Sequence, residues 1–150
     1  MGAEKILVVD DERLVRWSLR QKCEEWGFHV VEAEAGQPAL KVAQHESPDL
    51  ALLDVRLPDM SGLEVLEQFK KNGDVRAVIM ITADPQLDDV KTALKLGAYD
   101  FVGKPVDFDE LHVAIKNALE PPVYVMRFRH FVERFAGARA ITKSSVPRRR

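Results

Sequence analysis

Acidic side chains follow two apolar runs of this sequence without a gap. The run 6–9 is followed by three acids at 10–12, and the run 50–53 is followed by Asp54. Crowded carboxylates repel one another and favour a hard divalent cation, and Mg²⁺ binds to few carboxylates while leaving positions for phosphate oxygens. A carboxylate can also attack a phosphoryl group and form an aspartyl phosphate. The acids predict magnesium-dependent phosphoryl chemistry, provided that the fold brings them together.

A hydroxyl and an ammonium accompany two further apolar runs. Thr82 closes one of them, and Lys104 stands just after the run 98–102. During phosphoryl transfer such groups can hold the phosphoryl oxygens while a metal ion offsets the developing charge. Thr82 and Lys104 are therefore candidates to act together with Asp54.

Short apolar runs alternate with stretches of helical periodicity through the first 120 residues. The expected strands are 5–9, 29–33, 50–54, 77–82 and 98–102. Apolar residues recur at helical spacing in 13–26, 62–71, 88–96 and 107–119, and glycines stand where helices should stop, at Gly27, Gly73 and Gly97. This alternation predicts an α/β fold, a doubly wound parallel sheet with helices on both faces.

Such a sheet would bring the candidate residues together. Ligands of open parallel sheets bind at the carboxyl ends of the strands, near the point where the strand order reverses. Asp10 and Asp11 follow the first expected strand, Asp54 ends the third, Thr82 ends the fourth and Lys104 follows the fifth. We therefore expect these side chains at one edge of the sheet.

Each candidate also has a plainer interpretation when it is taken alone. The acids 10–12 could cap the helix that follows, because carboxylates favour a helix N-terminus. Lys104 could be a surface lysine, and Thr82 could be an ordinary β-branched strand residue. Their joint placement favours the chemical interpretation.

Charge is distributed unevenly along the chain, whose net charge is −2. Residues 121–150 contain eight Lys or Arg and one acid, Glu133, so residues 1–120 carry a net charge of −9. Pro121–Pro122 should end the last helix, and apolar residues at helical spacing in 125–135 predict a further amphipathic helix. We therefore expect a domain at 1–120 and a basic, partly helical tail at 121–150.

Cysteine content and hydropathy bound the setting of the protein. The single cysteine, Cys23, rules out an internal disulfide and favours a reducing, cytoplasmic location. No run approaches the roughly 20 apolar residues that a membrane helix needs, and the N-terminus is not typical of a signal peptide. We expect a cytoplasmic protein without a membrane span.

Four ordered motifs carry a family resemblance. They are "VVDDE" (8–12), "LLDVRLPDMSGLE" (52–64), "ITA" (81–83) and "GAYDFVGKP" (97–105). Over roughly residues 4–119 the chain resembles a response-regulator receiver domain of two-component signalling. The resemblance implies a flavodoxin-like fold, with five parallel strands in the order 2-1-3-4-5 and five helices.

The resemblance also implies roles for the acids. Asp54 would be the phosphoacceptor. Asp11 and Asp54 would bind Mg²⁺ through their side chains, and Asp10 would act directly or through a water molecule. Arg56 would offer its backbone carbonyl to the metal ion.

The remaining motif residues receive roles in the same way. Lys104 would pair with the phosphoryl group and precede a cis peptide bond to Pro105. The Thr82 hydroxyl would bond to the phosphoryl group in the active state. Phe101 stands at the aromatic switch position, although core packing explains this residue nearly as well as switching does.

Such a domain would take a phosphoryl group from a sensor histidine kinase and change conformation to control an output, with transcription expected. It would assist only its own phosphorylation and dephosphorylation. Three stretches, "LVRWSL" (14–19), "GAYDFVGKPVDFDEL" (97–111) and "ERFAGARAITKSSVPRR" (133–149), resemble regulators of the NtrC type, which activate sigma-54-dependent transcription. The chain contains neither a GxxxxGK[ST] phosphate loop nor a recognisable helix-turn-helix.

Partners and competing functions are less constrained. The resemblance points to a homodimer, formed through residues 88–119 or through the C-terminal segment. One alternative is a Mg²⁺-dependent phosphohydrolase that forms an aspartyl phosphate, but those enzymes resemble "DxDxT" after the first strand, where this chain has "DDERL". Another is a partner- or nucleic-acid-binding role of the basic tail, whose Lys and Arg could contact phosphates.

Overall fold

The computed structural model describes residues 3–120 of the chain. The helix expected in the C-terminal segment, and any role of the basic residues there, lie outside the described residues. Strands and helices alternate strictly along the described part. The strands are β1 (Lys5–Val9), β2 (His29–Ala33), β3 (Leu50–Asp54), β4 (Ala77–Thr82) and β5 (Asp100–Gly103).

The five strands form one parallel sheet in the order β2-β1-β3-β4-β5. β1 pairs with β2 on one side and with β3 on the other, so the strand order reverses between β1 and β3. The inner strands β3 and β4 are fully buried, as expected for parallel strands covered on both faces. The predicted fold class and strand order are confirmed.

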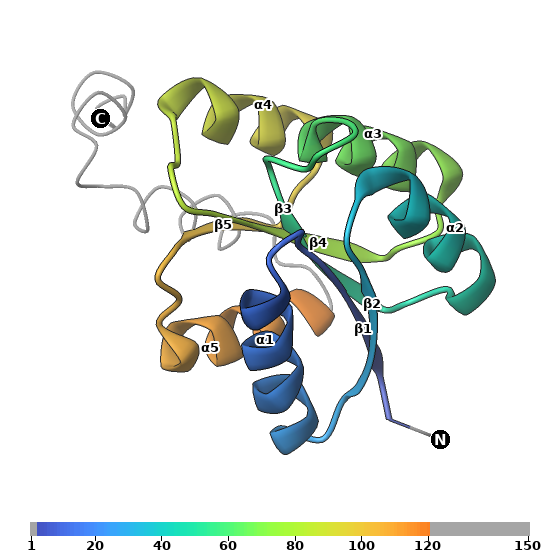
Figure 1. The fold of residues 1–150 in the computed structure, drawn as a ribbon, viewed down its shortest axis with the longest axis vertical. Coiled ribbons are helices and arrows are strands. Elements are labelled where there is room, and N and C mark those ends of the chain that lie inside the picture. Colours follow the sequence, from blue (N-terminus) through green and yellow to red (C-terminus); the bar gives the residue numbers. More distant parts are fainter. Residues whose placement is uncertain (1–2, 121–150) are drawn as a thin grey trace, which may run out of the picture. The chain divides into compact units, whose positions relative to one another are not determined.

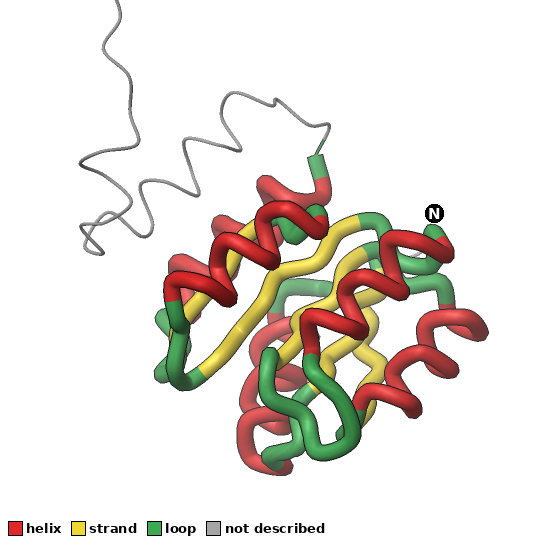
Figure 2. Tube along the Cα trace, turned by 90° about the horizontal axis from the view of Figure 1, so that it is seen from above, coloured by secondary structure: helices red, strands yellow, loops and turns green. Residues whose placement is uncertain are grey.

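Five helices cover the two faces of the sheet, which lies between them in Figures 1 and 2. They are α1 (Arg13–Glu25), α2 (Gly36–Glu46), α3 (Gly62–Asn72), α4 (Leu87–Leu96) and α5 (Phe108–Leu119). α1 and α5 pack on one face, where Leu19, Cys23 and Leu111 join the core with residues of the strands. α2, α3 and α4 cover the opposite face.

Local signals explain where several helices begin and end. Ser61 and Glu64 form a capping box at the start of α3, and the Asp107 side chain caps α5 by accepting from the backbone N–H groups of Asp109 and Glu110. α3 and α4 end at Gly73 and Gly97, which adopt φ angles of +72° and +100°. These left-handed conformations suit glycine because it has no Cβ.

One local boundary differs from the expectation, and one expected helix had no apolar stripe to mark it. The fifth strand begins at Asp100 and not at residue 98, because the Ala98 N–H still bonds to the carbonyl of Ala93 in α4. The helix at Gly36–Glu46 was implied by the alternation of elements but not marked by an apolar stripe, since it buries only Gly36, Ala39 and Ala43. Within residues 3–120, no helix has the length and apolar character needed to cross a membrane.

Candidate functional site

Three aspartates converge at the carboxyl ends of β1 and β3. Val9 and Leu53 are paired in the sheet, so Asp10 and Asp54 extend from neighbouring strand ends. Asp10, Asp11 and Asp54 each offer a carboxylate oxygen, and these oxygens all lie within 4.8 Å of one another. Asp10 and Asp54 are buried, whereas Asp11 is exposed. The acids that the sequence places after two strands therefore form one cluster.

The donor atoms of this cluster fit a hard divalent cation. All of them are carboxylate oxygens, which Mg²⁺ and Ca²⁺ prefer over nitrogen or sulfur ligands. Mg²⁺ suits three such oxygens with one exposed member, because it keeps several waters and leaves positions for the oxygens of a phosphoryl group. The donor set is therefore compatible with Mg²⁺.

Lys104 inserts its ammonium group between the acids. Its Nζ lies 2.8 Å from Oδ2 of Asp10, 3.2 Å from Oδ2 of Asp54 and 3.3 Å from Oε1 of Glu12. Burial alone would lower the pKa of Lys104, but the hydrogen bond to Asp10 and the charges of Asp10 and Asp54 outweigh it and raise the pKa. Lys104 is therefore a fixed cation at the centre of the cluster.

The surroundings of Asp54 shift the pKa of its carboxyl group. Its burial, together with the charge of Asp10, raises its pKa, although the Arg56 N–H and Lys104 act in the opposite direction. The Arg56 N–H donates to Oδ1 of Asp54 over 3.2 Å. One Asp54 oxygen thus meets the backbone and the other meets Lys104. This balance holds a buried carboxylate next to cationic and polar groups, as the chemistry of a nucleophile requires.

Thr82 and Phe101 lie on the adjacent strands. Asp54 pairs with Ile81, which places Thr82 one residue beyond, at the end of β4. Ile81 and Val102 belong to the core beneath α1 and α5, so alternation along the strands directs Thr82 and Phe101 to the opposite face. Both side chains are buried. Complete burial of Phe101 agrees with core packing, and a switching role stays a prediction.

The turn after β5 joins Lys104 to β4. The Lys104 N–H donates to the Thr82 carbonyl over 2.8 Å, and the Lys104–Pro105 peptide bond is cis. Lys104 is thereby anchored to the strand that carries Thr82.

The loop after Asp54 packs tightly against the strand. The Gly62 N–H donates to the Val55 carbonyl over 2.7 Å, and a Cβ at Gly62 would lie 1.9 Å from the Asp54 carbonyl oxygen. Only glycine allows this approach, so Gly62 shapes the backbone at Asp54. The side chain of Arg56 points away to solvent and lies 3.7 Å from Asp89 of α4.

The capping interpretation of the acids finds little support. Glu12 is the N-cap residue of α1 but makes no side-chain capping bond. Oδ1 of Asp10 accepts from the Glu12 N–H, and its Oδ2 meets Lys104. The acidic turn, residues 10–12, is thus organised around Lys104 more than around the start of α1.

Sequence reasoning missed three contacts of the site. It assigned no role to Glu12, which contacts Lys104, or to Arg16, which donates to the Asp10 carbonyl. It also missed Asp59, whose carboxylate accepts from the N–H groups of Gly36 and Gln37 at the start of α2. Position next to the Asp pair was the available signal for Glu12, whereas no motif marks Arg16 or Asp59.

Comparisons with known proteins identify relatives of this chain. The family model of the response regulator receiver domain matches residues 6–116. The chain is 38% identical to sporulation initiation phosphotransferase F of Bacillus subtilis over 119 residues, which cover 79% of this chain and 96% of that protein. It is 35% identical to the regulatory protein AtoC of Escherichia coli over 126 residues, which cover 84% of this chain and 27% of AtoC.

A solved structure extends the likeness to the fold. The response regulator protein TrrA from Thermotoga maritima, in complex with Mg²⁺ and BeF, matches with a TM-score of 0.70 and 35% identity. The match covers 77% of this chain and 99% of that structure. The chain spans about half or less of the length of several curated relatives that it matches, AtoC among them.

Proposed function

The chain belongs to the response regulator receiver domains of two-component signalling, and we propose that Asp54 is its phosphoacceptor. One observation carries this assignment: the Lys104 ammonium lies within 3.2 Å of Asp54, in a cluster that also contains Asp10 and Asp11. Among these acids, Asp54 is the one that belongs to a central strand, β3, and its two oxygens meet the Arg56 N–H and Lys104.

The proposed reaction is a transfer of one phosphoryl group. An oxygen of Asp54 forms a bond to phosphorus while the bond from phosphorus to the donor atom breaks, and the donor leaves with the electron pair of that bond. With a phosphohistidine donor the leaving group is the imidazole of the sensor histidine kinase. Water later cleaves the acyl phosphate and releases inorganic phosphate, which restores the Asp54 carboxylate.

Mg²⁺ would be held by side chains of Asp11 and Asp54, by Asp10 directly or through water, and by the backbone carbonyl of Arg56. When bound, the metal ion supplies positive charge against the phosphoryl oxygens. Lys104 would exchange its contact with Asp54 for a contact with the phosphoryl group, since that group would be attached to the same Asp54 carboxylate.

Thr82 and Phe101 would convert the chemical event into a conformational one. A hydroxyl at the end of β4 can bond to a phosphoryl group on the neighbouring Asp54, and Phe101 lies on the next strand at the same face. Rearrangement of these two residues would alter the surface of α4, β5 and α5, which is a local change that biases a two-state element.

The output and the partners extend the same proposal. We infer a receiver unit at residues 1–120, followed at 121–150 by the start of an output region of the NtrC type, with a sensor histidine kinase as donor. A homodimer through α4, β5 and α5 or through the C-terminal segment, and a cytoplasmic location, stay predictions.

The test uses acetyl phosphate as a small phosphodonor. The full chain is incubated with acetyl phosphate and Mg²⁺, and intact mass is compared with that of Asp54→Asn and of a sample containing EDTA. We expect one phosphoryl adduct on the wild type and none in either control. Labelling that persists in Asp54→Asn would remove Asp54 from the role.

A second result would redirect the assignment. Rapid multiple turnover of a phosphomonoester would favour the phosphohydrolase alternative over a receiver that modifies itself once. If no adduct accumulates on the wild type, titration with beryllofluoride separates fast dephosphorylation, in which it still binds, from a site that does not hold a phosphoryl group.

A further inference from the structure

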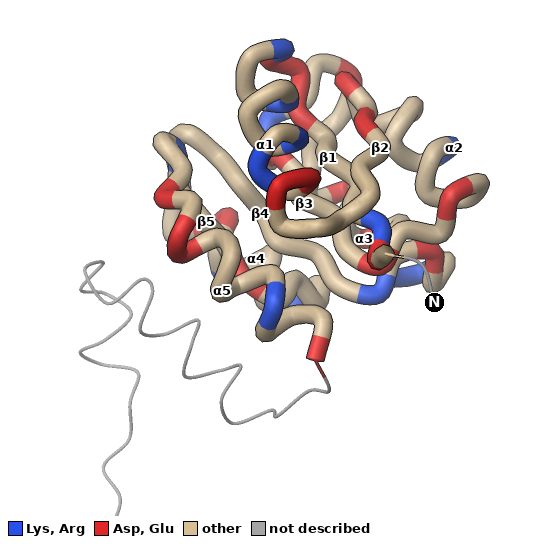
Figure 3. Tube along the Cα trace, turned by 90° about the horizontal axis from the view of Figure 1, so that it is seen from below, with Lys and Arg blue, Asp and Glu red and all other residues tan. Residues whose placement is uncertain are grey.

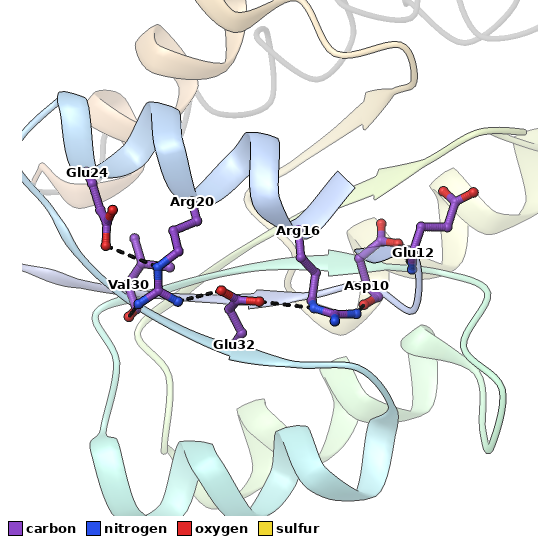
Figure 4. A network of polar contacts seen from close by, with 7 residues as sticks. All are labelled: Asp10, Glu12, Arg16, Arg20, Glu24, Val30 and Glu32. Carbon is purple, nitrogen blue, oxygen red and sulfur yellow. Dashed lines mark hydrogen bonds and ion pairs between the residues drawn. The ribbon is translucent and has the colours of Figure 1, made fainter. Parts of the chain in front are cut away.

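An ion-pair network connects the acidic turn to the edge strand β2 (Figure 4). The Arg16 guanidinium in α1 donates through Nη1 to the Asp10 carbonyl over 2.7 Å and through Nε to Oε1 of Glu32 over 3.0 Å. Glu32 lies on β2 and also pairs with Arg20, one turn further along α1. Acidic and basic residues lie side by side where α1 begins (Figure 3).

Arg16 completes the set of bonds that hold Asp10. The Asp10 N–H donates to the Ala33 carbonyl, Oδ1 accepts from the Glu12 N–H and Oδ2 accepts from Lys104. The remaining polar atom of Asp10 is its carbonyl oxygen, and Arg16 is its donor. This carbonyl belongs to the peptide that leads into Asp11, so its orientation fixes the direction in which the Asp11 side chain leaves the backbone.

Glu32 in turn holds Arg16. Burial works to raise the pKa of Glu32, but hydrogen bonds and charge from Arg20 and Arg16 outweigh it and lower the pKa. Glu32 therefore stays ionised and offers one oxygen to each arginine. The side chain of Arg16 is only 17% exposed, which shields its pair with Glu32 from solvent and salt.

We propose that Arg16, held by Glu32, is a positioning residue that sets the Mg²⁺ affinity of the acidic site by orienting the Asp10–Asp11 peptide. The proposal rests on the function proposed above, since it assumes that these acids bind Mg²⁺. Groups that orient metal ligands through a hydrogen bond commonly change metal affinity by about 10–100-fold when they are replaced.

The shape of the guanidinium matters more than its charge. Arg16 uses two nitrogens of one rigid plane to contact the Asp10 carbonyl and Glu32 together, and a lysine has a single nitrogen at the end of a flexible chain. An effect of charge alone predicts a different result. Any cation near the metal site weakens Mg²⁺ binding, and lysine keeps the positive charge of arginine. Arg16→Lys would then leave the Mg²⁺ affinity unchanged.

The experiment measures Mg²⁺ binding to the full chain by isothermal titration calorimetry, without a phosphodonor. Arg16→Lys is compared with Arg20→Lys, which makes the same chemical change on the same helix and also removes a partner of Glu32. Arg20 donates to the Val30 carbonyl and not to the acidic turn. We expect Arg16→Lys to raise the Mg²⁺ dissociation constant about 10-fold and Arg20→Lys to change it less than about twofold.

A double-mutant cycle tests whether Glu32 acts through Arg16. We expect Glu32→Gln to weaken Mg²⁺ binding in the wild type but to add little in the Arg16→Lys background. Glu24→Gln is the matched control, because it removes a negative charge from the same network at an exposed position. Thermal unfolding without Mg²⁺ checks that each variant is folded. If Arg16→Lys does not fold, Glu32→Gln takes its place in the comparison with the wild type.

The outcomes separate the two proposals. Equal Mg²⁺ affinities of wild type, Arg16→Lys and Glu32→Gln would overturn the positioning role and leave the metal site intact. Equal losses in Arg16→Lys and Arg20→Lys would also overturn it, since they would indicate a general effect of the network. Absence of Mg²⁺ binding by the wild type would overturn the proposed metal site and this inference with it.

Discussion

Nζ of Lys104 lies closer to Oδ2 of Asp10, at 2.8 Å, than to Oδ2 of Asp54, at 3.2 Å. The lysine thus bridges two buried carboxylates that would otherwise face each other without compensation. A buried acid pair without a cation is strongly destabilised, so Lys104 supplies charge that a metal ion can also supply. Lysine and metal are therefore expected to compete for these acids.

Replacing Lys104 by methionine should separate metal binding from phosphorylation. Lys104→Met removes the competing cation, so we expect Mg²⁺ to bind more tightly, because the ammonium charge no longer repels the metal ion. The same change removes a contact of the phosphoryl group, so the yield of the acetyl phosphate adduct should fall. Calorimetry with Mg²⁺ and intact mass give the two readouts.

Lys91→Met provides the matched control, because Lys91 is an exposed lysine of α4. It should change neither readout. A Lys104→Met variant that binds Mg²⁺ with unchanged affinity would show that lysine and metal do not compete.

Asp54→Asn should stabilise the metal-free protein. Burial and the charge of Asp10 raise the pKa of Asp54 on folding, so the folded state binds this proton more tightly than the unfolded state does. Stability is then lost as pH rises through the folded pKa, and the amide removes that loss. In EDTA near pH 7 we expect the melting temperature of Asp54→Asn to lie a few degrees above that of the wild type, with a smaller difference near pH 4.

Asp11→Asn is the control for this effect, because Asp11 is exposed and pays little desolvation cost for its charge. Its melting temperature should change less than that of Asp54→Asn. A lower melting temperature of Asp54→Asn at neutral pH would contradict the direction assigned to the Asp54 pKa.

The parts of the site that follow apolar strands could be predicted from sequence. Asp10, Asp54 and Thr82 stand at the ends of unbroken runs, and parallel pairing brings such ends to one edge of the sheet. The strand order itself followed from the family resemblance, because alternation of elements alone is compatible with several orders.

Contacts between side chains and distant backbone groups could not be predicted in the same way. The bond from Arg16 to the Asp10 carbonyl and the bonds from Gly36 and Gln37 to Asp59 depend on three-dimensional placement. Neither set of contacts follows the periodicity of a strand or a helix, so no sequence pattern predicts it. The early start assigned to β5 has a similar origin, because Ala98 bonds back to α4.

Gly62→Ala should disturb Asp54 from the backbone side. The added Cβ would lie 1.9 Å from the Asp54 carbonyl oxygen, so either the strand end or the start of α3 must move. We expect a loss of about 3 kcal/mol or more in the free energy of unfolding, with a lower adduct yield. Urea unfolding and intact mass after acetyl phosphate treatment provide the measurements.

Gly73→Ala separates this clash from the general effect of replacing glycine. Gly73 adopts a φ of +72° but has open space where a Cβ would stand. Its replacement should cost about 1 kcal/mol through backbone strain, without changing the adduct yield. Equal losses of stability in the two variants would refute a specific role of Gly62 at the site.

Asp59 should tie the loop after β3 to α2 in a pH-dependent manner. α2 has Ala35 at its N-cap, which cannot cap the helix, and the Asp59 carboxylate accepts from Gln37 and Gly36 in its place. These bonds lower the pKa of Asp59, so its contribution to stability is present above the unfolded pKa and is lost as pH falls through the folded pKa. We expect Asp59→Asn to melt a few degrees below the wild type near pH 7, and the difference to shrink as the pH falls below about 4.

Glu67→Gln, at an exposed position of α3, should melt like the wild type at both pH values. A difference between Asp59→Asn and wild type that stays constant with pH would show that the carboxylate charge does not stabilise the start of α2.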